Sequence, residues 1–480
     1  MKTTKEIKKT KIIKAKQQSM SNDDQLYNKI DYKFLIRFTL PTIISFVLWS
    51  VFGIIDGVFA SRGISVEALS AVNFIMPYFN FAMAITSMLS MGGMALVGKK
   101  IGEKKESEAR QNFSLLTIII FLSSIIISIA TVLFLDQILN LLGTDPLVLD
   151  LAKDYLMPLV YLMPVLMLGF YFTQFLVAEG KPVISAVVSV SGALVSTILN
   201  YLLTFHFEFG VSGLAWATGI GNSIPTIIGL YYFNFKREGN IYFVKPKWDL
   251  SAISRASYNG ISEMITMMAA TITTTVMNNI MVDLVGFEGV ASAGIVMATQ
   301  FIFISLYLGF SVGVQPLISH NYGQKNHSNL KKLYKKCLTI ITGLSIIAVI
   351  GAIIFAGSLV RIYVEPGNHF FEMTVRGLRI SAIGFFFMGF NVFAKSWFTG
   401  FNDGLISGYI SFMRVMIFTL LPLITLPRFW QLNGLWAALV VAEIISVIQT
   451  IYYLNKMGSK YRYKPKSENI TILRKQKITV

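Results

Sequence analysis

The sequence predicts an all-α polytopic membrane protein with twelve transmembrane helices, arranged as two six-helix lobes related by a pseudo-two-fold axis along the membrane normal. Three observations lead to this fold class. The chain is 54% apolar and only 14% charged, whereas a soluble domain is about 25% charged. Apolar stretches of about 20 residues, the length that crosses a bilayer as a helix, recur along the chain. The two halves of the chain also resemble each other in sequence.

The apolar stretches divide evenly between the two halves. The first six expected spans are Phe34–Phe59, Leu69–Val97, Phe113–Leu135, Tyr155–Ala178, Val183–Phe205 and Val211–Phe233. The second six are Ile261–Met281, Val290–Ile318, Leu338–Val360, Ile380–Phe398, Leu405–Leu426 and Leu435–Leu454. The expected domains are therefore a basic tail (1–33), an N-lobe (34–233), a linker (234–256), a C-lobe (257–455) and a second basic tail (456–480).

The positive charges predict the orientation of the spans. Most of the net charge of +17 lies in both tails and in the loops after the second, sixth and eighth spans. The loops after the third span (136–150) and the seventh span (282–289) contain no Lys or Arg. Because cytoplasmic loops carry an excess of Lys and Arg, we expect both termini in the cytoplasm and the protein in the cell membrane. This distribution argues against nucleic acid as a partner.

The chain repeats itself at an offset of 221 residues. "SMGGMALVGKKIGEKKES" (90–107) aligns with "SVGVQPLISHNYGQKNHS" (311–328), and "GLAWA" at Gly213 aligns with "GLWAA" at Gly434. Since each half holds an even number of spans, both halves enter the membrane the same way round. Two like-oriented bundles with a site between or within them are a common plan of secondary transporters.

Two carboxylates lie inside expected spans. Asp56 interrupts the apolar run "WSVFGIIDGVFASR" (49–62), and Glu263 lies near the start of the seventh span. A carboxylate in hydrocarbon costs roughly 2.5 kcal/mol or more at mid-span, so it persists where it faces a cavity, takes up a proton or binds a cation. Each carboxylate also has a plainer interpretation as a solvated residue near the membrane interface, and the residues alone leave this open.

Other polar residues in the spans suggest a cavity and an ion pair. Three neutral ones are candidates for a substrate cavity: Asn73, Gln174 and Gln300. Hydrogen bonds between helices explain each of these equally well. Arg414 lies deep in the eleventh span and needs a partner, and a structural ion pair with Glu443 is the favoured interpretation. Lys395 lies near an expected cytoplasmic end, from which its side chain can extend to the interface.

The sequence does not predict an enzyme. It contains neither a His-Glu-x-x-His motif nor a Gly-x-Ser-x-Gly turn, and its four histidines fall in or near loops. It has no cluster of metal ligands and no glycine-rich phosphate loop, so we expect no catalytic residue, no metal site and no cofactor apart from a coupling ion, H⁺ or Na⁺. The single cysteine, Cys337, excludes an intramolecular disulfide.

At "IIDGVFASRGISVEALSAVNFIMP" and "GGMALVGKKIGEKKESEARQNFS" the chain resembles the MATE family of multidrug and toxic-compound extrusion transporters. The resemblance continues through "GISEMITMMAATITTTVMNNIM" and "LNGLWAALVVAEII", and it covers almost everything from Phe34 to Leu454. It implies two lobes that form a V. It also implies a central cavity for amphipathic, often cationic compounds, which are exported by alternating access in exchange for Na⁺ or H⁺.

The chain departs from the family pattern at one acid. Members often carry Leu-Asp-Pro near the end of the fifth span, where this chain has "LNYLLTF", so Asn200 occupies the position of the acid. An amide cannot release a proton, although its oxygen can ligate a cation. The resemblance therefore leaves Asp56 as the expected ion-coupling residue. Glu263 is a second candidate, because a variant of the family uses an acid in the seventh span.

A second interpretation is a flippase for lipid-linked precursors, which has a related two-lobed plan. Such a protein should line its cavity with several Arg and Lys residues, because phosphate favours these partners. Here only Lys395 and Arg414 lie deep in the spans. The sequence therefore favours amphipathic, cationic or neutral small molecules as substrates, and we expect a monomer in the bilayer.

Overall fold

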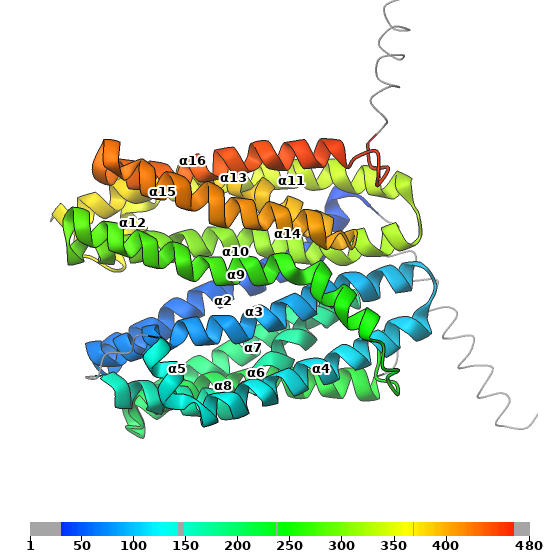
Figure 1. Cartoon of the computed structure of the whole chain (residues 1–480), viewed down its shortest axis with the longest axis horizontal. Helices are drawn as coiled ribbons and strands as arrows, with labels where there is room; N and C mark the ends of the chain where they lie inside the picture. Colours follow the sequence, from blue (N-terminus) through cyan, green and yellow to red (C-terminus); the bar gives the residue numbers. More distant parts are fainter. Residues whose placement is uncertain (1–29, 143–147, 237–238, 368, 465–480) are drawn as a thin grey trace, which may run out of the picture.

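The chain folds into long helices packed side by side (Figure 1). The computed structural model describes residues 30–142, 148–236, 239–367 and 369–464, and these contain no strand. The first half contains α2 (Tyr32–Gly63), α3 (Val66–Gly102), α4 (Glu106–Leu133), α5 (Leu135–Leu141), α6 (Leu149–Ala178), α7 (Pro182–Tyr201), the π-helix η2 (Leu202–His206) and α8 (Gly210–Phe235). The second half contains α9 (Leu250–Val285), α10 (Phe287–Gly323), α11 (His327–Ile354), α12 (Ala356–Arg361), α13 (His369–Gly400), α14 (Gly404–Phe412), the π-helix η3 (Met413–Thr419), α15 (Leu420–Thr425) and α16 (Pro427–Lys456).

Most of these helices are long and apolar enough to cross a membrane. Within the described residues, eleven helical segments meet that description by length and composition. The remaining expected span is α8, whose 26 residues include several Gly, Ser, Thr and Asn positions and which packs against α6 and α7. These small and polar residues lower the mean hydropathy of α8. They also let it approach its neighbours closely, so it keeps its place in the bundle. These helices confirm the predicted all-α membrane fold.

The basic loops lie together at one end of the molecule. The connections from α3 to α4, from α8 to α9 and from α10 to α11 all lie at the right of Figure 1. We call this end, formed by residues 103–105, 239–249 and 324–326, the basic end. The short helices α5 and α12 lie at the opposite end. The alternation of charge along the sequence therefore corresponds to two distinct ends in space.

Each lobe has its own apolar core, and each core takes in the start of the other lobe's first helix. The C-lobe core includes Leu35 and Phe38 from the start of α2. The N-lobe core includes Ala252 and Ala256 from the start of α9. Figure 1 shows both helices crossing between the lobes toward the basic end. The expected boundaries at residues 34 and 257 separate the lobes along the sequence. In space, the start of α2 packs in the C-lobe core and the start of α9 packs in the N-lobe core.

The helix α9 begins well before the apolar segment that was expected to form the seventh span. Its N-cap is Asp249, whose carboxylate accepts hydrogen bonds from the backbone N–H groups of Ser251 and Ala252 at 3.0 and 3.2 Å. The helix therefore starts at Leu250, inside the expected linker, rather than near Ile261. Its first turns are too polar for a hydropathy pattern to detect, whereas the capping carboxylate supplies the partners that a helix start needs.

The rest of the linker is attached to the N-lobe. The Glu179 carboxylate, at the end of α6, accepts hydrogen bonds from the backbone N–H groups of Asn240 and Ile241. The Arg110 guanidinium donates to the carbonyl oxygen of Asn240 at 2.9 Å, and it lies 4.2 Å from the centre of the Tyr242 ring. The polypeptide between the lobes therefore follows the surface of the N-lobe up to the start of α9.

Glycines bring the two lobes into backbone contact near the basic end. A Cβ atom on Gly92 of α3 would lie 1.9 Å from the carbonyl oxygen of Ala256, and one on Gly260 of α9 would lie 1.9 Å from that of Met88. Nearer the basic end, Cβ atoms on Gly102 of α3 and Gly323 of α10 would each lie 2.2 Å from a carbonyl oxygen of the opposite lobe. Only glycine allows helices to approach this closely.

Side-chain amides add hydrogen bonds across the same contact. The Gln315 amide donates to the carbonyl oxygen of Met91 at 3.0 Å. The Asn402 amide donates to the carbonyl oxygen of Ala95 at 3.2 Å and accepts from Asn259 at 2.6 Å. The lobes are therefore held together at the basic end by close helix packing and by hydrogen bonds.

Candidate substrate cavity and buried ion pairs

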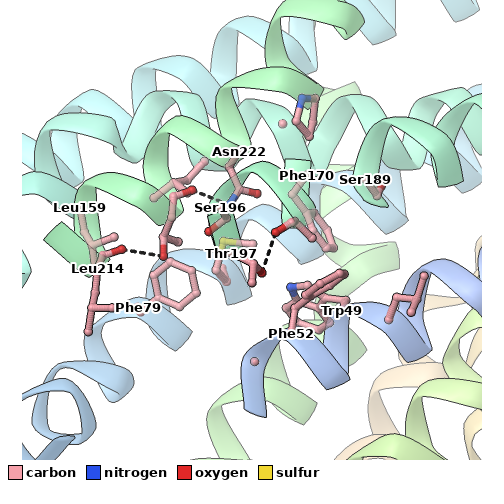
Figure 2. Close-up of a pocket in the computed structure, with 18 of the residues that line it drawn as sticks. Trp49, Phe52, Phe79, Leu159, Phe170, Ser189, Ser196, Thr197, Leu214 and Asn222 are labelled. Atoms are coloured by element: carbon pink, nitrogen blue, oxygen red, sulfur yellow. Dashed lines mark hydrogen bonds between the residues drawn. The ribbon is translucent and has the colours of Figure 1, made fainter. Parts of the chain in front are cut away.

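A cavity of about 430 Å³ lies within the N-lobe, between α2, α3, α6, α7 and α8. Figure 2 shows part of its wall. Small-molecule sites typically occupy about 300–1,000 Å³. The aromatic side chains of the wall are Phe46, Trp49, Phe52, Phe79, Tyr155, Phe170 and Phe301. Phe301 is contributed by α10 of the C-lobe, and its ring meets Trp49 edge-on with 5.8 Å between the ring centres.

Several hydroxyls of the wall act as hydrogen-bond acceptors toward the cavity. None of the described lining residues is charged. The hydroxyls of Thr173, Thr197 and Thr218 donate to backbone carbonyls of their own helices at 2.7, 3.0 and 3.0 Å. The amide nitrogen of Asn222 donates to the carbonyl oxygen of Thr218 at 2.8 Å, and Figure 2 draws bonds of this kind as dashed lines. Because their hydrogens are bonded to the helices, the three hydroxyls offer oxygen lone pairs to the cavity, and the Asn222 amide offers an acceptor oxygen together with its second N–H.

This wall suits cations and hydrogen-bond donors better than anions. Aromatic faces attract cations through the negative charge of their π-systems, and the free lone pairs add acceptors without a formal charge. Gln174 adds another acceptor: its side-chain oxygen is buried and has no hydrogen-bond partner within the described residues. A phosphate or carboxylate, by contrast, would find no described cation on the wall.

Three of the residues that were expected to bind substrate or ion lie on this wall. Asn73 of α3, Gln174 of α6 and Asn200 of α7 all line the cavity. Gln300 is half-buried on α10 and is absent from the lining, where the next residue, Phe301, takes its place. Successive residues of a helix point about 100° apart, so Gln300 points away from the direction in which Phe301 reaches the wall.

The expected coupling residue lies just beyond the described wall. Asp56 is in the last turns of α2, but its side chain lies outside the described residues. On the same helix, Phe52 and Gly53 line the cavity four and three positions earlier. Positions three and four apart share one face of a helix. Position 56 therefore continues the face of α2 that borders the cavity.

Glu263 does not lie on the cavity wall but forms an ion pair in the C-lobe. The ammonium nitrogen of Lys395, on α13, donates to a carboxylate oxygen of Glu263 at 2.8 Å. Lys395 is only 4% exposed, so the structure corrects the expectation that it extends to the interface. A buried lysine needs a nearby opposite charge, and Glu263 supplies it. The charge of Glu263 is thereby offset within the protein.

Arg414 and Glu443 also meet, in the middle of the C-lobe. Arg414 lies in the π-helix η3, and its guanidinium donates to Glu443 of α16, with the shortest bond at 2.6 Å. The other carboxylate oxygen of Glu443 accepts from the Asn391 amide at 2.7 Å, and Asn391 accepts from the Thr450 hydroxyl at 2.8 Å. The expected pair is thus part of a network that joins α13, η3 and α16.

The sequence matches the MatE family twice, over residues 41–202 and over residues 263–424. The chain belongs to the MatE family. The double match corresponds to the internal repeat and places one family unit in each lobe. This result confirms the resemblance of the sequence to MATE transporters and identifies the chain as a transporter rather than an enzyme.

Individual relatives within the MatE family are distant. A protein named "Multidrug export protein MepA" from Staphylococcus haemolyticus (strain JCSC1435) is 26% identical over 379 residues, which are 76% of this chain and 83% of the relative. A protein with the same name from Staphylococcus aureus (strain MSSA476) is 26% identical over 381 residues, with the same shares.

Solved structures of MATE proteins share the fold. A "Crystal structure of MATE in complex with MaL6" has a TM-score of 0.86 and 18% identity, over 92% of this chain and 99% of the other. A structure titled "Outward-facing conformation of a multidrug resistance MATE family transporter of the MOP superfamily" has a TM-score of 0.85 and 18% identity, over 92% and 98%. Together with the helices described above, these neighbours confirm the twelve-span, two-lobed fold.

Sequence reasoning missed several parts of the MatE-family cavity. Trp49 and Asn222 both line it, and neither was predicted. Trp49 lies seven residues before Asp56, two helical turns away on the same face, so an aromatic stripe leading to the acid was an available signal. Asn222 had no such signal, because polar residues in membrane helices most often bond to neighbouring helices.

Removing Arg414 is expected to destabilise this transporter strongly. The variant Arg414→Met leaves the buried Glu443 carboxylate without its cation, which typically costs about 3–5 kcal/mol. The double variant Arg414→Met/Glu443→Gln should regain most of this loss, because a glutamine oxygen still accepts from Asn391. Thermal unfolding of the purified protein in detergent measures both effects, with Arg379→Met on the exposed side of α13 as the control. Equal melting temperatures for Arg414→Met and the control would show that the pair contributes nothing to stability.

Proposed function

We propose that this chain is a secondary active multidrug efflux transporter, which exports amphipathic, often cationic compounds by alternating access in exchange for H⁺ or Na⁺. The observation that carries the proposal is the uncharged N-lobe cavity, whose wall combines aromatic faces with oxygen acceptors. Such a wall binds varied hydrophobic cations without a shape-specific contact. The two staphylococcal relatives are named as multidrug export proteins, which supports the same conclusion.

Coupling to H⁺ at Asp56 is the favoured form of this proposal. Asn200 cannot release a proton, so Asp56 is the acid left at the N-lobe cavity on the family pattern. A single carboxylate holds a metal cation weakly, but it can exchange a proton with water on either side of the membrane. Glu263 is a poor site for Na⁺, because Lys395 already supplies its positive partner at 2.8 Å.

The flippase interpretation is less favoured by the same geometry. Lys395 and Arg414, the two deep cations, are both engaged by carboxylates and lie in the C-lobe. The described wall of the N-lobe cavity offers no cation to a pyrophosphate.

The basic end is proposed to face the cytoplasm of the cell, with both termini on that side. Its Lys- and Arg-rich loops follow the usual charge asymmetry of membrane proteins. In this orientation the glycine contacts close the cytoplasmic side of the molecule. The proposed transport cycle alternates this arrangement with one that is open to the cytoplasm.

Transport in vesicles tests the proposal. Ethidium is expected to accumulate in proteoliposomes whose lumen is more acidic than the medium, and a protonophore should release it. A Na⁺ gradient at equal pH should drive little accumulation if H⁺ is the coupling ion, and ATP without an ion gradient should drive none. Accumulation that requires ATP, or that is the same with and without the two gradients, would contradict secondary active transport.

A further inference from the structure

An apolar groove of about 280 Å³ opens on the C-lobe, apart from the N-lobe cavity. Its floor is α13, with Phe386, Phe387 and Phe390, and its walls are α11 and α16. In Figure 1 these three helices lie on the side of the C-lobe away from the N-lobe. Neighbouring residues of α16 such as Ile448 and Tyr452 are exposed at 63% and 54%, as expected for a surface that faces lipid.

The groove runs from the basic end toward the middle of the bilayer. On α16 its lining extends from Asn455 back to Val447, a distance of about 12 Å along the helix axis. Asn455 lies next to the last residue of α16, where a spanning helix meets the lipid headgroups. The groove therefore begins at headgroup depth and continues into the hydrocarbon region, as a bound acyl chain would.

A half-buried lysine lies at the mouth of the groove. The ammonium group of Lys464 donates to the side-chain oxygen of Asn455 and lies 5.0 Å from the centre of the Tyr334 ring. No carboxylate of the described residues forms an ion pair with it. Burial lowers the pKa of Lys464, because removal from water disfavours its charged form. Lys335 is exposed on α11 near the same end of the bundle and adds positive charge.

We propose that this groove binds an anionic phospholipid, with one acyl chain against α13 and the phosphate at Lys464. The phosphate supplies an anionic partner for the Lys464 ammonium group. The phenylalanine side chains of the floor keep water away from the acyl chain of the lipid. Charge complementarity favours this occupant over a zwitterionic lipid, whose headgroup cation offsets the charge of its phosphate beside Lys464. The site does not depend on the transport cycle proposed above.

Lipid binding to the purified full-length protein tests the proposal. In detergent, fluorescent phosphatidylglycerol is expected to bind more tightly than phosphatidylcholine with the same chains. Lys464→Gln should weaken phosphatidylglycerol binding by about tenfold, the effect of one charge-assisted hydrogen bond. It should weaken phosphatidylcholine binding less, because the choline cation offsets the phosphate charge. The matched control is Lys456→Gln, which removes a lysine at the same end of α16 outside the groove and should bind like the wild type.

A second variant tests the groove itself. Leu338→Trp adds volume on the α11 wall and should weaken binding of both lipids, while an unchanged melting temperature would show that the fold is intact. Three results would overturn the proposal. They are equal binding by Lys464→Gln and Lys456→Gln, equal affinity for the two headgroups, and displacement of the lipid by a synthetic peptide of residues 465–480. The last result would assign the groove to the chain's own C-terminal tail.

Discussion

Replacing Asp56 by asparagine is expected to reduce gradient-driven efflux to the rate of protein-free vesicles, while substrate binding persists. Asparagine has nearly the same size and keeps an oxygen acceptor, but it cannot take up or release a proton. Position 56 continues the helix face on which Phe52 and Gly53 border the cavity. On the proposed mechanism, a proton released at this position is exchanged for a cation in the cavity.

The comparison needs both a flux and a binding measurement. Ethidium accumulation under a proton gradient reports transport, and fluorescence polarisation of ethidium with the purified protein reports binding. Asp283→Asn is the matched control, because it makes the same chemical change at an exposed position near the end of α9. If Asp56→Asn and Asp283→Asn both transport at the wild-type rate, Asp56 is an interfacial residue. Loss of binding together with transport would instead indicate a structural role.

Hydropathy could predict the apolar parts of the spanning helices but not their polar ends. Spans whose apolar residues continue to the helix ends were placed closely: the fifth span was expected at Val183–Phe205 and is observed at Pro182–His206. The start of α9 was missed by eleven residues, because Asp249 and the polar turn after it begin a helix outside the apolar segment. The exchange of helix starts between the lobes depends on packing between distant segments, which no local pattern reports.

Some contacts of the candidate site could be predicted from the sequence, and others could not. Arg414 and Glu443 could be paired in advance, because a cation deep in a span needs a partner and an acid lies in the next span. The partner of Glu263 could not be found, because Lys395 is 132 residues away and seemed free to reach the interface. Phe301 could not be distinguished among 37 phenylalanines until the structure showed which of them reach the cavity.

The substitution Gly92→Ala is expected to impair transport by forcing the lobes apart at the basic end. The new Cβ would lie 1.9 Å from the carbonyl oxygen of Ala256 and 2.6 Å from the backbone nitrogen of Gly260. Carbon atoms in contact normally stay about 3.5–4.0 Å from their neighbours, so the two helices would have to separate by roughly 1.5 Å. The atoms in the way belong to the backbone, so a change of side-chain rotamer cannot relieve the clash.

We therefore expect Gly92→Ala to destabilise the arrangement in which the basic end is closed, relative to the open arrangement of the proposed cycle. Overpacking of this kind costs about 1–3 kcal/mol, which corresponds to a population shift of roughly five- to 150-fold.

Spin labels on cysteines introduced at the exposed residues Ser107 of α4 and Lys331 of α11 measure the separation, and the buried native Cys337 should remain unlabelled. The matched control is Gly343→Ala on α11, where a Cβ has no neighbour within 4 Å. Gly92→Ala should lengthen the label distance and slow ethidium transport relative to Gly343→Ala. Identical distances and rates for the two variants would mean that the glycine contact between α3 and α9 does not close the basic end.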